Sequence, residues 1–224
     1  MVDTQQLKIL PNTEVASAGL IWLLFVLAFV PDYTRGETLV AGALGIPLVA
    51  MGVAANRRVR EHRHLSRRSS AQLGFLSLGI GLAMGVAILG ALLWFGRIDP
   101  EVNQDFIRFA GEPWWKPLGR AFSAAVIEEV VFRYFGMAVL VWIVIWRGVT
   151  PKRAYWFSLI ATALVFGLVH MSGIPTVAAA RVCLNATAGL VVGYVFWRWS
   201  LIHAVAIHFF AGLVVQSLGP HLAS

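Results

Sequence analysis

Long apolar runs alternate with short polar or basic segments along the chain. Seven of these runs reach or exceed the roughly 17–25 residues that an α-helix needs to cross a bilayer. They cover residues 15–31, 37–55, 71–95, 119–146, 154–171, 175–197 and 200–218. The pattern predicts an all-α, polytopic transmembrane helix bundle of about 7–8 spans, which forms a single integral membrane domain over residues 1–224.

The composition is typical of a membrane protein and excludes a soluble domain of this size. Hydrophobic residues make up 58% of the 224 residues, and charged residues only 13%. The net charge of +7 by itself would fit a nucleic-acid partner, but six arginines fall in one short segment, 56–68: Arg57, Arg58, Arg60, Arg63, Arg67 and Arg68. No soluble module remains to present a basic surface to nucleic acid, so we expect no such partner.

The basic segments predict how the chain is oriented in the membrane. Lys and Arg resist translocation, so segment 56–68 is expected on the cytoplasmic side. Arg147, Lys152 and Arg153 form a second basic loop two crossings later, on the same side. The N-terminus is then cytoplasmic, and the longest loop, 96–118, faces outward. The Ala-, Gly- and Arg-rich chain looks bacterial, which predicts the bacterial inner membrane as its location.

Small residues inside the apolar runs are interpreted as packing positions. Glycines recur in the third run at Gly79, Gly81, Gly85 and Gly90, and small residues let neighbouring membrane helices approach closely. Cys183 is the only cysteine and lies in an apolar run. It is therefore expected to pack rather than to react, and a lone cysteine excludes an intrachain disulfide and a thiolate metal cluster.

Three ionisable residues inside the fourth run are the strongest functional signal. A charge at the centre of a membrane helix costs roughly 2.5–3.5 kcal/mol. On one α-helix, Glu129 and Arg133 are four residues apart and can form an ion pair. Glu128 points about 100° away from Glu129 and has no partner nearby in the sequence. The pattern indicates one structural ion pair beside one working carboxylate; the alternative is a purely structural polar cluster between helices.

Two histidines in other runs favour the working carboxylate. His170 closes the fifth run, and His208 lies midway along the last one. With a rise of 1.5 Å per residue, all three side chains fall within roughly 15 Å of one another in depth, so Glu128 and the two imidazoles can share one site. His203 lies near the cytoplasmic end of the last run and is expected outside this site.

These positions resemble the motifs of a known family. Residues 128–133, EEVVFR, fit the Glu-Glu-x-x-x-Arg motif of the CAAX prenyl protease and bacteriocin-processing family (CPBP, or Abi) of intramembrane glutamic endopeptidases. Residues 166–170, FGLVH, fit its Phe-x-x-x-His motif, and His208 falls where its His-x-x-x-Asn motif is expected. The resemblance covers roughly residues 118–215 and points to Rce1-like members, with a myxosortase-like branch as a second relative.

The resemblance implies a glutamate-dependent intramembrane protease and a role for each matching residue. Glu128 would be the general base that activates a water, and His170 would help to position that water. Glu129 would be held by Arg133. His208 would contribute to the site that stabilises the oxyanion.

The chain departs from the family pattern at one position. The residue four after His208 is Gly212, where the family has an asparagine that donates to the oxyanion. Losing one such donor typically lowers the rate by about 10²–10³-fold. Asn185, the one asparagine in the later runs, is a candidate replacement, although it can equally bond a backbone carbonyl. Arg181 is a candidate contact for a substrate carboxylate or a lipid headgroup, and the alternative is an arginine that snorkels to the interface.

Other functions use the same residue types. His170, His208 and one glutamate make a plausible His₂Glu zinc set, but no His-Glu-x-x-His helix is present, so we favour a mechanism without a cofactor and keep zinc as the alternative.

An ion- or proton-coupled transporter also places charges in the membrane, but the first three runs show no repeat of the motifs. A catalytically inactive relative that acts as a scaffold or immunity protein is the third possibility, because of Gly212.

The predicted partners are the lipid bilayer and a membrane-anchored protein or peptide. The predicted orientation puts the site nearer the outer face, which argues against trimming CAAX proteins at the cytosolic face. It fits cleavage of a peptide bond near the membrane boundary of an exported protein. The oligomeric state does not follow from the sequence.

Overall fold

The computed structural model describes residues 35–223 except 64, 65 and 67, and within these residues it is helical and contains no strand. The elements are α2 (Arg35–Val59), η1 (Arg60–His62), α3 (Ser70–Gly96), α4 (Pro100–Ile107), α5 (Trp115–Glu128), the π-helix η2 (Glu129–Met137), α6 (Ala138–Trp146), α7 (Pro151–Val169), α8 (Pro175–Arg198) and α9 (Leu201–Leu222). The predicted all-α fold class is confirmed.

The predicted spans coincide with the long helices. Within the described residues, five helices are long and apolar enough to cross a membrane, and α5, η2 and α6 together form one of them: Ser70–Gly96, Trp115–Trp146, Pro151–Val169, Pro175–Arg198 and Leu201–Leu222. Helix α2 covers the second predicted span, and the first, 15–31, lies outside the described residues. The chain is therefore an integral membrane helix bundle.

Local sequence signals set where these helices begin. Ser69 and Gln72 form a capping box at the start of α3. Pro151 and Pro175 occupy the first positions of α7 and α8, where the missing N–H leaves no hydrogen bond unmade. The turn before α8 contains Gly173 at φ +93°, a conformation that other residues rarely adopt.

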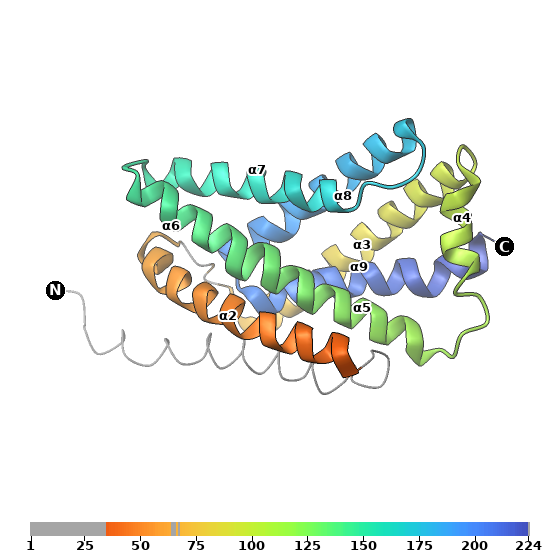
Figure 1. The fold of residues 1–224 in the computed structure, drawn as a ribbon, viewed down its shortest axis with the longest axis horizontal. Coiled ribbons are helices and arrows are strands. Elements are labelled where there is room, and N and C mark those ends of the chain that lie inside the picture. Colours follow the sequence, from red (N-terminus) through yellow and green to blue (C-terminus); the bar gives the residue numbers. More distant parts are fainter. Residues whose placement is uncertain (1–34, 64–65, 67, 224) are drawn as a thin grey trace.

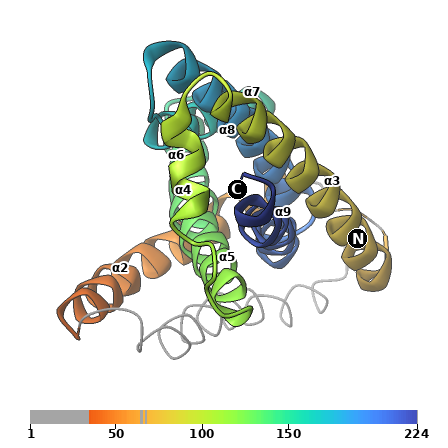
Figure 2. The same cartoon turned by 90° about the vertical axis from the view of Figure 1, so that its right-hand side faces the viewer.

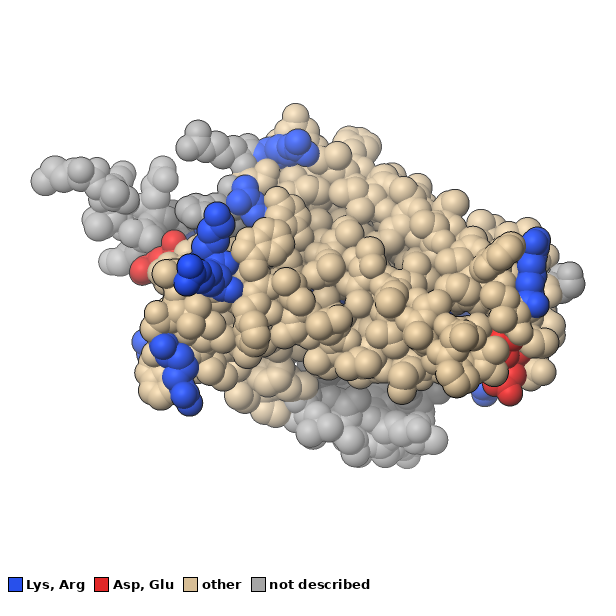
Figure 3. Space-filling view, turned by 90° about the horizontal axis from the view of Figure 1, so that it is seen from above, with Lys and Arg blue, Asp and Glu red and all other residues tan. Residues whose placement is uncertain are grey.

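Charged side chains gather at the two ends of the bundle (Figure 3). The connection after α2 and the turn between α6 and α7, both basic, lie at the same end (Figure 1). Helix α4 crosses the opposite end, next to the C-terminus (Figures 1 and 2). This separation agrees with a membrane band between the ends and with two basic loops on one side.

Helices α3 and α9 pack closely through two of the predicted glycines. A Cβ atom on Gly81 would lie 2.8 Å from the carbonyl oxygen of Ile207, and one on Gly85 would lie 2.8 Å from that of Ala211. Both glycines are buried. Because these neighbours are backbone atoms, they cannot move aside without separating the helices.

We expect Gly85→Ala to lower the stability of the bundle by about 1–3 kcal/mol, the usual penalty for overpacking. Gly90→Ala is the matched control, because among residues 35–223 no heavy atom lies within 4 Å of a Cβ added at Gly90 or Gly79. The packing role predicted for these last two glycines is therefore wrong. Thermal unfolding of both variants in detergent measures the difference, and an equal loss of stability would contradict this account of the α3–α9 contact.

Candidate active site

The two adjacent glutamates lie where an α-helix becomes a π-helix. Glu128 is the last residue of α5, and Glu129 is the first residue of η2, which continues to Met137. The α-helical geometry predicted for residues 128–133 is therefore wrong over most of its length. π-helical segments are rare and frequently occur at functional sites.

Glu129 and Arg133 nevertheless form the predicted ion pair, which is deeply buried. Their side chains are 0% and 2% exposed, and Arg133 Nη1 lies 3.1 Å from Glu129 Oε1. Arg133 Nη2 donates to the carbonyl of Gly189 at 3.3 Å, and the guanidinium lies 4.4 Å from the ring centre of Phe166. The pair is thus enclosed by α8 and α7.

His208 contacts both glutamates. Its Nδ1 lies 2.8 Å from Glu129 Oε1, and its Nε2 lies 3.6 Å from Glu128 Oε2. Because the Glu129 carboxylate is paired with Arg133 and accepts hydrogen bonds, Nδ1 donates and Nε2 faces Glu128. The contact between Glu129 and His208 was not predicted, because no local spacing indicates it.

His170 approaches Glu128 from the end of α7. Its Nδ1 lies 2.7 Å from the carbonyl oxygen of Phe166, which can only accept, so Nδ1 donates. Its Nε2 lies 3.7 Å from Glu128 Oε2. The Phe166 ring packs against both imidazoles, with ring centres 4.7 Å from His170 and 6.0 Å from His208. Phe166 therefore helps to fix both rings.

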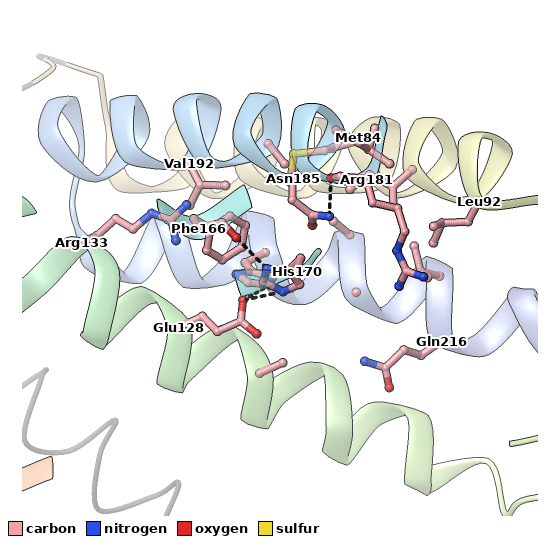
Figure 4. A pocket seen from close by; sticks show the side chains of 18 residues that line it. Met84, Leu92, Glu128, Arg133, Phe166, His170, Arg181, Asn185, Val192 and Gln216 are labelled. Carbon is pink, nitrogen blue, oxygen red and sulfur yellow. Dashed lines mark hydrogen bonds and ion pairs between the residues drawn. The ribbon is translucent and has the colours of Figure 1, made fainter. Parts of the chain in front are cut away.

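The structure thus brings Glu128, His170 and His208 together, as the sequence predicted. Glu128 Oε2 is buried and has no hydrogen-bond partner among the described residues. These side chains line a cavity of about 350 Å³ between α3, α5, α7, α8 and α9 (Figure 4). Glu128 Oε2 and the Nε2 atoms of His170 and His208 offer three polar contacts, the number that a buried water usually makes.

The remaining predicted residues line the same cavity. Asn185 and Arg181 lie on α8, and the Asn185 amide donates to the Arg181 carbonyl at 2.9 Å. Gly212 also lines the cavity, and a Cβ there would meet Ala121 at an ordinary 3.5 Å. Gln216, one turn further along α9, is a lining residue that the sequence analysis missed. Gln216 could have been found in the sequence as a polar side chain within the last apolar run, eight residues after His208.

Two other residues lie outside this cavity. His203 bonds Ser200 through Nδ1 at 2.8 Å and packs against Trp199, away from the glutamates. Cys183 is exposed on α8. The packing role predicted for Cys183 is therefore wrong, because its side chain faces outward.

The geometry of Glu128, His170 and His208 also concerns the predicted zinc alternative. Among the residues that the structure describes, no group of three or more His, Cys, Asp or Glu side chains is arranged to hold a metal ion. Each imidazole Nε2 instead stands 3.6–3.7 Å from a carboxylate oxygen of Glu128.

Comparison with known families gave a match over part of the chain. Residues 110–214 match the family described as type II CAAX prenyl endopeptidase Rce1-like, which confirms the resemblance to CAAX-type proteases. The matched range contains Glu128, His170 and His208 but ends before Gln216. The comparisons with curated proteins and with solved structures gave no match. This similarity to a protease family supports protease activity.

Proposed function

We propose that the protein is an intramembrane endopeptidase in which Glu128 activates the attacking water. It cleaves a peptide bond near the membrane boundary of a membrane-anchored protein or peptide. The observation that carries this proposal is the position of Glu128 Oε2, which is buried and faces the Nε2 atoms of two histidines. Within the part of the chain that the structure describes, this oxygen has no hydrogen-bond partner. A carboxylate held in this way can accept a proton from a bound water.

In the proposed reaction, Glu128 takes one proton from water, and the water oxygen bonds to the scissile carbonyl carbon. The C=O π electrons move to oxygen and form an oxyanion. When the C–N bond breaks, the protonated Glu128 gives its proton to the leaving nitrogen. The products are a carboxylic acid and an amine, and Glu128 returns to its starting state.

The surrounding residues have supporting roles. His170, fixed by the Phe166 carbonyl, positions the water through Nε2. Glu129 accepts a hydrogen bond from Nδ1 of His208 and is itself held by Arg133. His208 can donate to the oxyanion from Nε2 only when the ring carries a proton on both nitrogens. The buried ion pair therefore acts on the reaction through the orientation of His208.

The amide of Asn185 is proposed as a weaker support for the oxyanion. It lines the cavity with Glu128, and one of its N–H bonds is already directed to the Arg181 carbonyl. Its second N–H is available for another acceptor. Gly212 has no side-chain donor, which keeps an inactive relative as the alternative to be tested.

The substrate is proposed to enter from the side opposite the basic loops. With Cys183→Ser as background, we expect Gln104→Cys to react with a membrane-impermeant maleimide in intact cells. Glu61→Cys should react only after the cells are permeabilised. The side chains of Gln104 and Glu61 are both exposed. Gln104 lies on α4 and Glu61 on η1 directly after α2, and these elements lie at opposite ends of the bundle (Figure 1). Labelling of Glu61→Cys alone in intact cells would reverse the orientation and move the N-terminus outside.

The proposed function is tested by cleavage. The purified full-length protein in detergent is incubated with membrane-anchored peptides, and products are identified by mass spectrometry. Glu128→Gln at equal expression is the decisive comparison. Cleavage that persists in this variant would exclude Glu128 as the base.

A further inference from the structure

One buried asparagine joins α2 to the π-helix that carries the Glu129 carboxylate. Helix α2 packs against η2 and α6 (Figure 1). Asn56, near the end of α2, begins the basic segment 56–68, yet this residue is only 4% exposed. Its Nδ2 donates to the carbonyl of Gly52 at 2.8 Å and to the carbonyl of Tyr134 at 2.9 Å. The second of these bonds links two helices that are far apart in the chain.

The orientation of the Asn56 amide follows from its partners. Carbonyl oxygens can only accept, so the group that faces both of them is the NH₂ group and not the amide oxygen. On the other side of the amide, Arg63 Nη1 lies 3.5 Å from Asn56 Oδ1, and a guanidinium can only donate. Asn56 therefore directs one N–H bond within α2 and the other toward η2.

The π-helix explains why a side chain donates to Tyr134. In an α-helix, the Tyr134 carbonyl would accept from the backbone N–H of Ala138, four residues later. Here the Ala138 N–H is directed to the carbonyls of Arg133 and Phe135. A buried carbonyl that gives up its backbone donor is stabilised by another donor. The Asn56 amide supplies one, and so favours the π register of η2 over the α register.

Gly52 permits this contact by letting the two backbones approach each other. A Cβ atom added at Gly52 would lie 2.9 Å from the Tyr134 carbonyl oxygen and 2.6 Å from Tyr134 Cδ1. Because one of these neighbours is a backbone atom, a larger residue would push α2 away from η2. The hydrogen bond between Asn56 and Tyr134 would then lengthen. Gly52 and Asn56, one helical turn apart, thus form one contact with the π-helix.

The register of η2 decides where the buried ion pair stands. A π-helix bonds residue i to residue i+5, so it turns by a smaller angle per residue than an α-helix. Glu129 begins η2 and Arg133 lies inside it, so a return to the α register would rotate both side chains relative to α9. The distance of 2.8 Å between Glu129 Oε1 and His208 Nδ1 tolerates little rotation. Asn56 thus bears on the orientation of His208, although it does not line the cavity.

We propose that Asn56 is a positioning residue that keeps η2 in its π register and thereby keeps Glu129 in hydrogen-bond contact with His208. The proposal rests on the proposed function, since it concerns the same reaction. Asn56 touches no reacting atom and acts only through η2. It lies before residues 110–214, the range that matches the protease family. Helix α2 is thereby assigned a part in supporting the active site.

Two substitutions test the role of the amide. Asn56→Leu removes both donors with little change in side-chain size. Asn56→Ser can still donate to the Gly52 carbonyl four residues earlier but is too short to reach Tyr134, and it keeps a polar group in place should Asn56→Leu fail to fold. Both variants are expected to lower kcat for peptide cleavage by about 10²-fold with KM little changed, the usual cost of misplacing a catalytic group by about 1 Å.

Val59→Ala is the matched control. Val59 is buried on the same helix, and its truncation weakens the packing of α2 without removing a donor. All rates are measured well below the melting temperature of each variant, so that each protein is folded. Val59→Ala is expected to lower the melting temperature and to keep the wild-type kcat. An equal loss of kcat in Val59→Ala and Asn56→Ser would mean that α2 acts through stability alone, which overturns the proposal.

The hydrogen bond between His208 and Glu129 gives a readout that needs no cleavage. In full-length protein with isotope-labelled histidine, the NMR signal of the His208 Nδ1–H group is assigned as the one missing in His208→Gln. We expect this signal to persist in Val59→Ala and to be shifted or lost in both Asn56 variants. An unchanged signal, or a wild-type kcat, in Asn56→Ser overturns the proposal. If the wild type cleaves no peptide, the proposed function fails, and the signal still decides whether Asn56 positions Glu129.

Discussion

Replacing Glu128 with glutamine is expected to lower the rate of peptide cleavage by about 10²–10⁴-fold, the range for loss of a general base. Glutamine keeps the size and polarity of the side chain but cannot accept a proton from water. Because Glu128 Oε2 forms no direct hydrogen bond with the described residues, the fold should be unaffected. Initial rates on membrane-anchored peptides, with the melting temperature measured in the same detergent, separate chemistry from stability.

Glu101→Gln is the matched control for Glu128→Gln. Glu101 is an exposed carboxylate on α4, outside the catalytic cavity, and its replacement should leave the rate unchanged. A zinc chelator added to the wild type distinguishes the two mechanisms. A rate that is unchanged by chelator supports the metal-free reaction, and a rate lost with chelator and restored by zinc requires a zinc enzyme.

Arg133→Met should lower the free energy of unfolding by about 3–5 kcal/mol, the usual effect of breaking a buried ion pair. The Glu129 carboxylate is 0% exposed and would be left without its cation. The variant also removes the hydrogen bond to the Gly189 carbonyl. Thermal unfolding in detergent and the yield of folded protein measure the effect.

The double variant Glu129→Leu with Arg133→Met separates stability from catalysis. Replacing both members of a buried pair with apolar residues is often neutral or stabilising, so much of the stability should return. Cleavage should not return, because His208 loses the carboxylate that orients it. A single Arg133→Met variant that unfolds at the wild-type temperature would contradict the structural role of the pair, and an active double variant would contradict the role of Glu129.

The spans could be predicted because they depend on local properties of the chain. The predicted range 71–95 corresponds to Ser70–Gly96, and 175–197 corresponds to Pro175–Arg198. A run of apolar residues long enough to cross the bilayer must satisfy its own backbone hydrogen bonds, and a helix does so within one segment. The ion pair between Glu129 and Arg133 is local in the same sense, since four residues separate its members.

The sequence did not reveal how the helices pack. It could not distinguish Gly85, which touches the backbone of α9, from Gly90, where no described heavy atom lies within 4 Å of an added Cβ. Nor did it indicate the π-helix η2, because the residues from Glu129 to Met137 also fit an α-helical pattern. Both features depend on which neighbouring helix lies against a given face.

The sequence by itself determined the membrane class, the helices and the residue types of the candidate site, because transfer free energy and motif spacing are properties of short segments. Beyond the ion pair of Glu129 with Arg133 and the meeting of Glu128 with two histidines, only the tertiary structure decided which polar groups meet. His208 bonds Glu129 across 79 residues, and Arg120 bonds Gln216 across 96. These contacts depend on how α5, η2 and α9 lie against each other, which spacing along the chain does not specify.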